Sequence, residues 1–306
     1  MQPAVRFMAI VVWALATLPA AADLVAHYEF SRDFLDSSGK AGHGNPSTTL
    51  GFVEGPAGFG TGLALSNGVY HAGPHYPEPP QYVDCAEVEG PPRSLALTVT
   101  VWLKCAARAS AEADVIVSGG AATNGWRLCR EPRFNYLALD FWGPNWGGGG
   151  GGGPVLADGR WHHYAIAMAD GACRVFVDGQ PKGSGGGAPV AAPLRLTPVR
   201  IGGQAQLNAY LSGCVDDLRV YDEALSQSQI IAIMIPPPVL QIVRQGDQLR
   251  ISWPTRAGDF LLEACAGTPE PAAWQPVEST MVRRDETWQT TVNNASPACF
   301  FRLRAR

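Results

Sequence analysis

Residues 211–226, LSGCVDDLRVYDEALS, hold the pattern that decides the fold. Leu218 and Val220 are two positions apart, so they share one face of an extended strand and direct apolar groups toward a core. Asp216 has the same parity, which predicts a buried carboxylate unless a β-bulge intervenes. Val215 has the opposite parity and points to such a bulge. We therefore expect a core strand whose carboxylate needs a partner, because an unpaired buried charge is costly.

A short helix is expected directly after this strand. Ser226, followed three positions later by Gln229, forms the pattern of a capping box. The mostly apolar residues 230–234 come next, and Pro236 ends the helix because proline has no backbone N–H to donate.

Short apolar runs separated by turn residues occupy most of the chain before this helix. The 306 residues include 35 glycines and 25 prolines, and Asp-Gly pairs punctuate the apolar runs. This spacing predicts an all-β, antiparallel sandwich. The expected strands are 24–30, 97–104, 114–117, 126–129, 136–141, 161–168, 174–177, 199–202 and 215–221.

Four further motifs precede the deciding stretch in order: GWRL at 125–128, GRWHHYA at 159–165, VFVDG at 175–179 and IGG at 201–203. With residues 211–226 they resemble the laminin G-like jellyroll family of the concanavalin A-like lectin/glucanase superfamily. The resemblance runs over nearly all of residues 24–234. It implies two curved antiparallel sheets packed face to face, with the first and last strands adjacent.

The N-terminal residues 1–22 have the pattern of a cleaved signal peptide. Arg6 precedes the apolar residues 7–18, and small residues follow up to Ala22. We expect a protein that is secreted or at the cell surface, with no membrane span after cleavage, because no later apolar run approaches 18 residues. A net charge of −4 with only 23 lysines and arginines argues against nucleic acid as a partner.

The triproline Pro236–Pro238 predicts a boundary between two domains, since it cannot lie inside a sheet. It separates a jellyroll domain, residues 23–235, from a small module, residues 239–306. Alternating apolar residues in the smaller segment resemble fibronectin type III-like β-sandwiches.

Seven cysteines in an exported chain suggest disulfide bonds rather than a metal site. Cys265 and Cys299 flank expected strands of the small module, and a bridge between them would contribute roughly 3 to 4 kcal/mol. We predict this pair. The other five allow two bridges with one thiol left over, and the sequence does not choose among them: Cys85, Cys105, Cys129, Cys173 and Cys214.

Two segments depart from the family pattern and are candidates for ligand binding. Trp142, Asn145 and Trp146 stand before seven glycines, 147–153, which we expect to form a flexible tether that does not pack. The insertion 70–80 carries Tyr70 and Tyr76. Aromatic faces stack on the C–H faces of sugars, but Trp142 and Trp146 are equally suited to finishing the edge of the core.

Asp36 and Asp216 are candidate ligands for a structural calcium ion, because oxygen ligands suit calcium and such sites occur in this fold. The alternative is that these carboxylates cap backbone N–H groups. His163 shares a strand face with Trp161, and we expect it to be a hydrogen-bonded structural residue rather than a catalytic base.

Glucanases of this fold carry a Glu-x-Asp-x-x-Glu strand, since retaining hydrolysis needs two carboxyl groups. The nearest segment here places Glu112 and Asp114 correctly but has Val117 at the third position. We therefore predict a protein that is not an enzyme.

The sequence as a whole predicts a secreted, non-enzymatic binding protein. Its partner is expected to be carbohydrate or an extracellular or cell-surface protein. Two alternatives stay open: a structural or adhesive cell-surface protein without a small-molecule ligand, and an accessory of a polysaccharide-acting enzyme.

Overall fold

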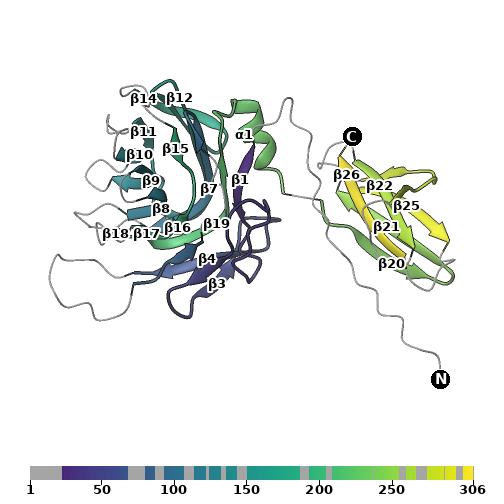
Figure 1. The fold of residues 1–306 in the computed structure, drawn as a ribbon. Helices are drawn as coiled ribbons and strands as arrows, with labels where there is room; N and C mark the ends of the chain where they lie inside the picture. The colour runs from purple at the N-terminus through teal and green to yellow at the C-terminus, as the bar shows by residue number, and fades with distance from the viewer. Residues whose placement is uncertain are drawn as a thin grey trace. The chain divides into compact units, whose positions relative to one another are not determined.

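A computed structural model describes most of the chain after the N-terminal segment (Figure 1). The predicted signal peptide, residues 1–22, lies outside the described residues. The remaining chain separates into two compact units with the boundary between Met234 and Ile235. The described ranges are 23–67, 80–86, 93–106, 114–121, 124–131, 136–142, 150–186, 193–204, 209–236, 238–254, 260–266, 274–285, 287–293 and 299–305.

The larger unit is a sandwich of two antiparallel sheets, which we name sheet A and sheet B (Figure 1). Sheet A has the order β14-β13-β12-β7-β19-β4-β3, and β1 also pairs with β19. The first and last strands of this unit are therefore adjacent, as the family resemblance implies. The strands of sheet A are β1 (Leu24–Tyr28), β3 (Gly51–Glu54), β4 (Thr61–Ser66), β7 (Leu97–Ala106), β12 (Asp158–Ala169), β13 (Ala172–Val177), β14 (Gln180–Gly186) and β19 (Ser212–Tyr221).

Sheet B has the order β11-β10-β9-β8-β16-β5-β2. Two small two-stranded sheets accompany the sandwich: β6 (Arg93–Ser94) with β15 (Leu194–Arg195), and β17 (Gly203–Gln204) with β18 (Ala209–Tyr210). The strands of sheet B are β2 (Gly44–Pro46), β5 (Val83–Cys85), β8 (Asp114–Ala121), β9 (Asn124–Glu131), β10 (Tyr136–Trp142), β11 (Gly150–Pro154) and β16 (Val199–Ile201).

The core lies between the two sheets, because alternate residues of each strand point inward. On β7 the inward residues include Val99, Val101 and Leu103, and on β9 they include Trp126 and Leu128; all five are buried. Burying each large apolar side chain contributes roughly 1.5 to 3 kcal/mol. The faces of the two sheets that point away from this core are called their outer faces below.

A β-bulge interrupts β19 at the deciding stretch. Val215 pairs with Leu63 of β4, whereas Leu218 pairs with Tyr28 of β1, and Asp217 adopts a φ of 47° between them. The predicted bulge is thus confirmed, and it turns Asp216 to the outer face of sheet A, opposite Trp102. Asp216 is nevertheless buried, because the loop between β3 and β4 covers it.

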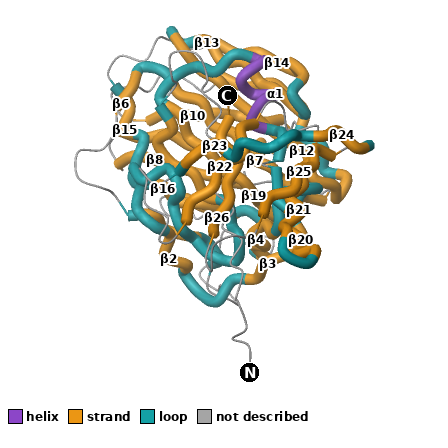
Figure 2. Tube along the Cα trace, turned by 90° about the vertical axis from the view of Figure 1, so that its right-hand side faces the viewer, coloured by secondary structure: helices purple, strands orange, loops and turns teal. Residues whose placement is uncertain are grey.

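The expected helix is α1 (Gln227–Ile233), the single helix in the described part of the chain (Figure 2). Both hydrogen bonds of the capping box between Ser226 and Gln229 are present. Ile230 and Ile233 pack on the outer face of sheet A against Phe176 and other apolar residues. The helix therefore closes one end of that face.

Part of the glycine run forms β11 and pairs with β10. A Cβ atom on Gly153 would lie 2.3 Å from Val175 Cγ1, and a Cβ atom on Gly183 would lie 2.5 Å from the carbonyl carbon of Gly152. The prediction that the run does not pack is wrong for these residues, since the absence of side chains lets β11 approach the other sheet closely. Residues 147–149 lie outside the described residues.

The smaller unit is a sandwich of a four-stranded sheet, β20-β21-β25-β24, and a three-stranded sheet, β23-β22-β26. Its core is formed by Leu249, Ile251, Trp253 and the inward residues of β22 and β26. The strands are β20 (Gln241–Gln245), β21 (Gln248–Pro254), β22 (Phe260–Ala266), β23 (Gln275–Pro276), β24 (Val282–Arg284), β25 (Thr287–Asn293) and β26 (Cys299–Ala305).

No disulfide joins any two of the seven cysteines, all of which are described residues. In the small unit Cys265 pairs with Phe300, and Cys299 pairs with Ala266. Since residues directly opposite share a face and successive residues alternate, the side chains of Cys265 and Cys299 leave opposite faces of the β22–β26 pair. In this register the predicted bridge between them does not form.

Candidate functional site

The predicted aromatic ligand residues lie at or beyond the ends of described strands. Trp142 is the last residue of β10, opposite Gly125 of β9, and its side chain is not described. Asn145, Trp146, Tyr70 and Tyr76 lie outside the described residues. Residues 143–149 join β10 to β11, and the insertion 70–80 leads into β5. Both segments therefore adjoin strands of sheet B.

The outer face of sheet B carries a continuous row of polar side chains, one from each of six neighbouring strands. Register pairs each member directly with the next, so the side chains stand side by side on one face. Their chain neighbours, such as Leu139 and Val199, point inward to the core. We call this set the polar row: Asp140 (β10), Arg127 (β9), Ser118 (β8), Arg200 (β16), Asp84 (β5) and Asn45 (β2).

Ion pairs hold both arginines of the polar row. Arg127 Nε donates to Asp140 Oδ2 at 2.8 Å, and one terminal guanidinium nitrogen of Arg127 donates to Gln204 Oε1 at 3.2 Å. Arg200 binds Asp84 with both ends of its fork, at 2.5 and 2.8 Å. The bidentate geometry restricts the guanidinium of Arg200 to one plane. Because the row contains two arginines and two aspartates, its net charge is zero.

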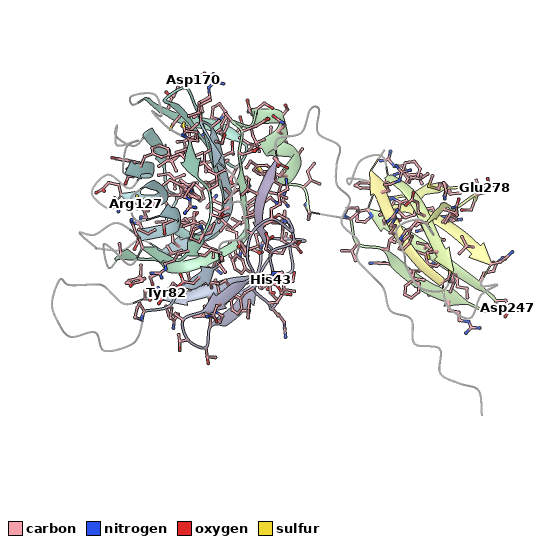
Figure 3. All side chains as sticks on the ribbon, in the orientation of Figure 1. His43, Tyr82, Arg127, Asp170, Asp247 and Glu278 are labelled. Atoms are coloured by element: carbon pink, nitrogen blue, oxygen red, sulfur yellow. The ribbon has the colours of Figure 1, made fainter. Side chains whose placement is uncertain are left out.

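Aromatic rings cover the Arg200 end of the polar row. The guanidinium carbon of Arg200 lies 4.3 Å from the ring centroid of Tyr82, and Tyr82 stacks on Tyr210 at 5.9 Å with an interplanar angle of 22°. Tyr210 belongs to β18. Figure 3 shows Arg127 and Tyr82 on the same side of the sandwich.

The β17–β18 pair lies over the middle of the row. Ser118 Oγ donates to the carbonyl of Gly203 at 2.9 Å, and Ala209 packs against Val115, Cys129 and Ala138. Ser118 is therefore buried, whereas both arginines and both aspartates of the row are half-exposed. Rigid, half-exposed donors and acceptors beside aromatic rings suit a neutral, polyhydroxylated ligand. The sequence alone did not reveal this site, because its members are spread from residue 45 to residue 200.

The segment that resembles a glucanase motif is structural. Asp114 is almost fully buried and forms an ion pair with Arg130 at 3.4 Å, while Val117 lies in the core. Glu112 lies outside the described residues.

The carboxylate of Asp36 accepts several hydrogen bonds from nearby residues of the chain. Its carboxylate oxygens accept from the backbone N–H groups of His27, at 2.8 Å, and Ala41, at 3.1 Å, and from both the N–H and the hydroxyl of Ser38. Both oxygens are thereby occupied. This geometry fits the alternative in which Asp36 caps backbone donors.

Asp216 is bonded on one oxygen only. Oδ1 accepts from the N–H of Asp217 at 2.8 Å, and Oδ2 has no hydrogen-bond partner within the described residues. Burial, followed by repulsion from Asp217, raises the pKa of Asp216 to about 8. The described residues contain no cluster of three or more His, Cys, Asp or Glu side chains that could hold a metal ion, and a calcium site at Asp36 and Asp216 stays a prediction.

His163 is buried, but its ring is not hydrogen-bonded within the described residues. Neither ring nitrogen has a partner within the described residues, and burial lowers its pKa to about 4. Its ring meets Trp102 edge-on at 5.3 Å. The prediction of a hydrogen-bonded histidine side chain is therefore wrong, and burial keeps the ring neutral. The adjacent His162 binds Asp178 instead, at 2.8 Å.

Comparison with known proteins agrees with this architecture. Residues 81–231 match the model of the concanavalin A-like lectin/glucanases superfamily. No match was found among curated proteins. No helix in the described residues is long and apolar enough to cross a membrane.

Three solved structures illustrate the likeness. The binding domain of botulinum neurotoxin DC, in complex with rat synaptotagmin II, has a TM-score of 0.53 and 9% identity over 90% of this chain and 87% of that chain. The binding domain of botulinum neurotoxin serotype D/C VPI 5993 has a TM-score of 0.52 and 7% identity, with the same coverage of both chains. Domain 4 of AbnA, a GH43 extracellular arabinanase from Geobacillus stearothermophilus, in complex with arabinotriose, has a TM-score of 0.46 and 19% identity over 69% of this chain and 97% of that chain. From the sequence match and the two antiparallel sheets together, the larger unit has the fold of the concanavalin A-like lectin/glucanases superfamily.

Proposed function

We propose that this protein is a secreted, non-enzymatic binding protein that recognises carbohydrate on the outer face of sheet B. The observation that carries the proposal is the polar row. Its two arginines and two aspartates offer donors and acceptors in fixed planes, and their charges cancel. Sugar hydroxyls both donate and accept, so they match such a row, while a neutral ligand is not repelled by either sign of charge.

Tyr82 and the predicted tryptophans complete the proposed site. Tyr82 lies over Arg200, and its stacking on Tyr210 gives a rigid aromatic surface beside this arginine. Trp142 ends β10, the strand that carries Asp140, and Trp146 follows four positions later, outside the described residues. The proposal therefore expects a ligand longer than one sugar unit, which contacts aromatic rings as well as the polar side chains of the row.

A glycan array with the full chain tests the proposal. The expected result is binding to one class of neutral oligosaccharide that falls about tenfold in Arg127→Gln and in Arg200→Gln, since each loses a charge-assisted contact. Trp142→Ala and Trp146→Ala are expected to weaken binding as well.

Arg174→Gln is the matched control, because Arg174 is an exposed arginine on β13 of the other sheet. Its binding should equal that of the unmodified chain. An array without hits for a folded sample would overturn carbohydrate binding and favour the adhesive alternative. Equal losses in all three arginine variants would overturn the assignment to sheet B.

A further inference from the structure

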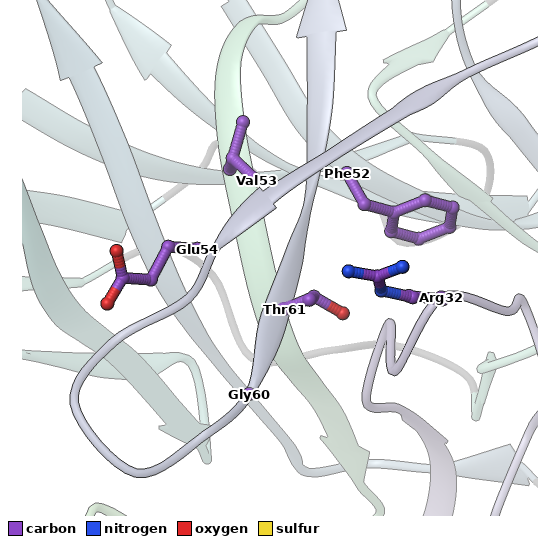
Figure 4. A pocket seen from close by; sticks show the side chains of 6 residues that line it. All are labelled: Arg32, Phe52, Val53, Glu54, Gly60 and Thr61. Atoms are coloured by element: carbon purple, nitrogen blue, oxygen red, sulfur yellow. The ribbon is translucent and has the colours of Figure 1, made fainter.

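A cavity away from the polar row lies beside the β3–β4 hairpin of sheet A. It has a volume of about 550 Å³ and is lined by six residues, which Figure 4 shows: Arg32, Phe52, Val53, Glu54, Gly60 and Thr61. Its residue Arg32 follows the end of β1, and its residues Gly60 and Thr61 stand at the start of β4, which pairs with β19 just before the bulge. Neither the motifs of the sequence nor the matched family segment, residues 81–231, includes these six residues.

Arg32 brings an unpaired positive charge to this cavity. Its guanidinium has no hydrogen bond or ion pair within the described part of the chain, and the residue is exposed. Glu54, the carboxylate among the lining residues, points to the other side of the hairpin in Figure 4. The charge of Arg32 is therefore available to a ligand.

The backbone that presents Arg32 is held in a strained conformation. Phe30 has a φ of 50° and Arg32 a φ of 65°, values that side chains other than glycine rarely adopt. The N–H of Arg32 and the hydroxyl of Thr61 both donate to the carbonyl of Phe30, each at 2.7 Å. Such strain persists only where the surroundings enforce it, and it concentrates at functional sites.

Phe52 supplies an apolar wall next to the guanidinium. Its ring is half-buried and packs against the ring of Phe34, with centroids 5.4 Å apart, and this contact holds it in place. Figure 4 shows Phe52 and Arg32 on the same side of the hairpin. An aromatic wall beside a free guanidinium complements a pyranose ring that bears an anionic group.

We propose that this cavity binds an acidic sugar unit, with the carboxylate on the fork of Arg32 and one face of the ring against Phe52. A guanidinium matches a carboxylate with two parallel hydrogen bonds, whereas a neutral hydroxyl receives one weaker bond. The site is separate from the polar row and does not depend on the ligand bound there.

The test is a titration of the full chain with glucuronate, glucose and acetate, followed by saturation-transfer NMR or calorimetry. Glucuronate should bind more tightly than glucose, which lacks the charge, and than acetate, which lacks the ring. Arg32→Gln should weaken the affinity for glucuronate about tenfold, to the affinity for glucose, since it removes a charge-assisted pair. Phe52→Leu should weaken glucuronate and leave acetate unchanged.

Arg174→Gln again serves as the matched control and should bind glucuronate normally. A folded Arg32→Gln chain that keeps full affinity, equal affinities for glucuronate and glucose, or no binding of glucuronate would each overturn the proposal. Arg127→Gln separates the two sites. If it abolishes glucuronate binding, the cavity assignment fails. If Arg127→Gln weakens only the binding of the array ligand, both site assignments are supported. An array without hits together with glucuronate binding that depends on Arg32 would support the cavity and overturn the polar-row site.

Discussion

Oδ2 of Asp216 lies so close to Gly55 that a Cβ atom on this glycine would be 2.5 Å from it. Asp216 is on the β19 bulge, and Gly55 begins the loop between β3 and β4 that buries it. The close approach explains how a carboxylate on the outer face of sheet A is shielded from water without a side chain above it.

Gly55→Ala is expected to destabilise the larger unit by about 1 to 3 kcal/mol, because the methyl group would displace either Asp216 or the backbone of Gly60. Chemical denaturation measures the change. Gly51→Ala is the matched control, since a Cβ atom at Gly51 meets nothing within 4 Å. Equal stabilities of the two variants would contradict the close packing described here.

The stability of the larger unit should fall as the pH rises from 6.5 to 8. Burial raises the pKa of Asp216 to about 8 and that of Glu29 to about 7, so the folded state keeps protons that the unfolded state has lost. Stability therefore declines as pH approaches these values, by roughly 1 to 2 kcal/mol over this range. His162 adds to the fall: burial lowers its pKa, but the hydrogen bonds that its ring donates to Asp178 and Asp158 outweigh this and raise the pKa overall.

Two buried histidines act in the opposite direction at lower pH. Burial lowers the pKa of His163 to about 4, and burial followed by repulsion from Arg219 lowers that of His27. Between about pH 4 and 6.5 the unfolded state binds more protons at these two histidines, so their contribution to stability rises with pH and offsets the falling contribution of Asp216 and Glu29 in that range. Above pH 6.5 this offset ends, and the decline is steepest there.

Asp216→Asn should reduce the decline between pH 6.5 and 8, because the amide does not ionise. Thermal melts at a series of pH values provide the measurement. Asp170→Asn, at an exposed turn residue labelled in Figure 3, is the control and should keep the full decline. An unchanged profile in Asp216→Asn would show that this carboxyl does not titrate in the range.

Asp36→Ala is expected to destabilise the protein by about 2 to 3 kcal/mol, since its removal leaves the buried N–H groups of His27 and Ala41 without acceptors. Asp33→Ala, which removes a single bond to Leu35 at 3.2 Å, should cost less. For each of the two proteins, the unmodified chain and Asp36→Ala, the melting temperature in calcium should equal its own melting temperature in chelator. A rise in Tm with calcium that Asp36→Ala abolishes would instead establish the predicted metal site.

We expect peptide mapping under non-reducing conditions to find no bridge between Cys265 and Cys299, because their side chains leave opposite faces of the β22–β26 pair. Cys299→Ser should accordingly leave the melting temperature of the small unit nearly unchanged in the absence of reductant. A mapped Cys265–Cys299 peptide would require the β22–β26 register to differ by one residue.

Local patterns in the sequence were sufficient for the all-β class, the capping box of Ser226 and Gln229, and the bulge beside Val215. Each of these depends on residues within a few positions of one another, where the two-residue period of a strand or the first turn of a helix sets the outcome. The pairing of the first strand with the last followed from the family resemblance.

Only the tertiary structure decided which distant residues meet. The polar row joins Asn45 to Asp140 through four intervening strands, and no local spacing encodes that register. The partner of Asp216 is likewise a glycine 161 positions earlier, and the glycines of β11 pack because another sheet lies beside them. Periodicity assigns a side chain to a face of its own strand, but what covers that face is determined by how the sheets and loops pack.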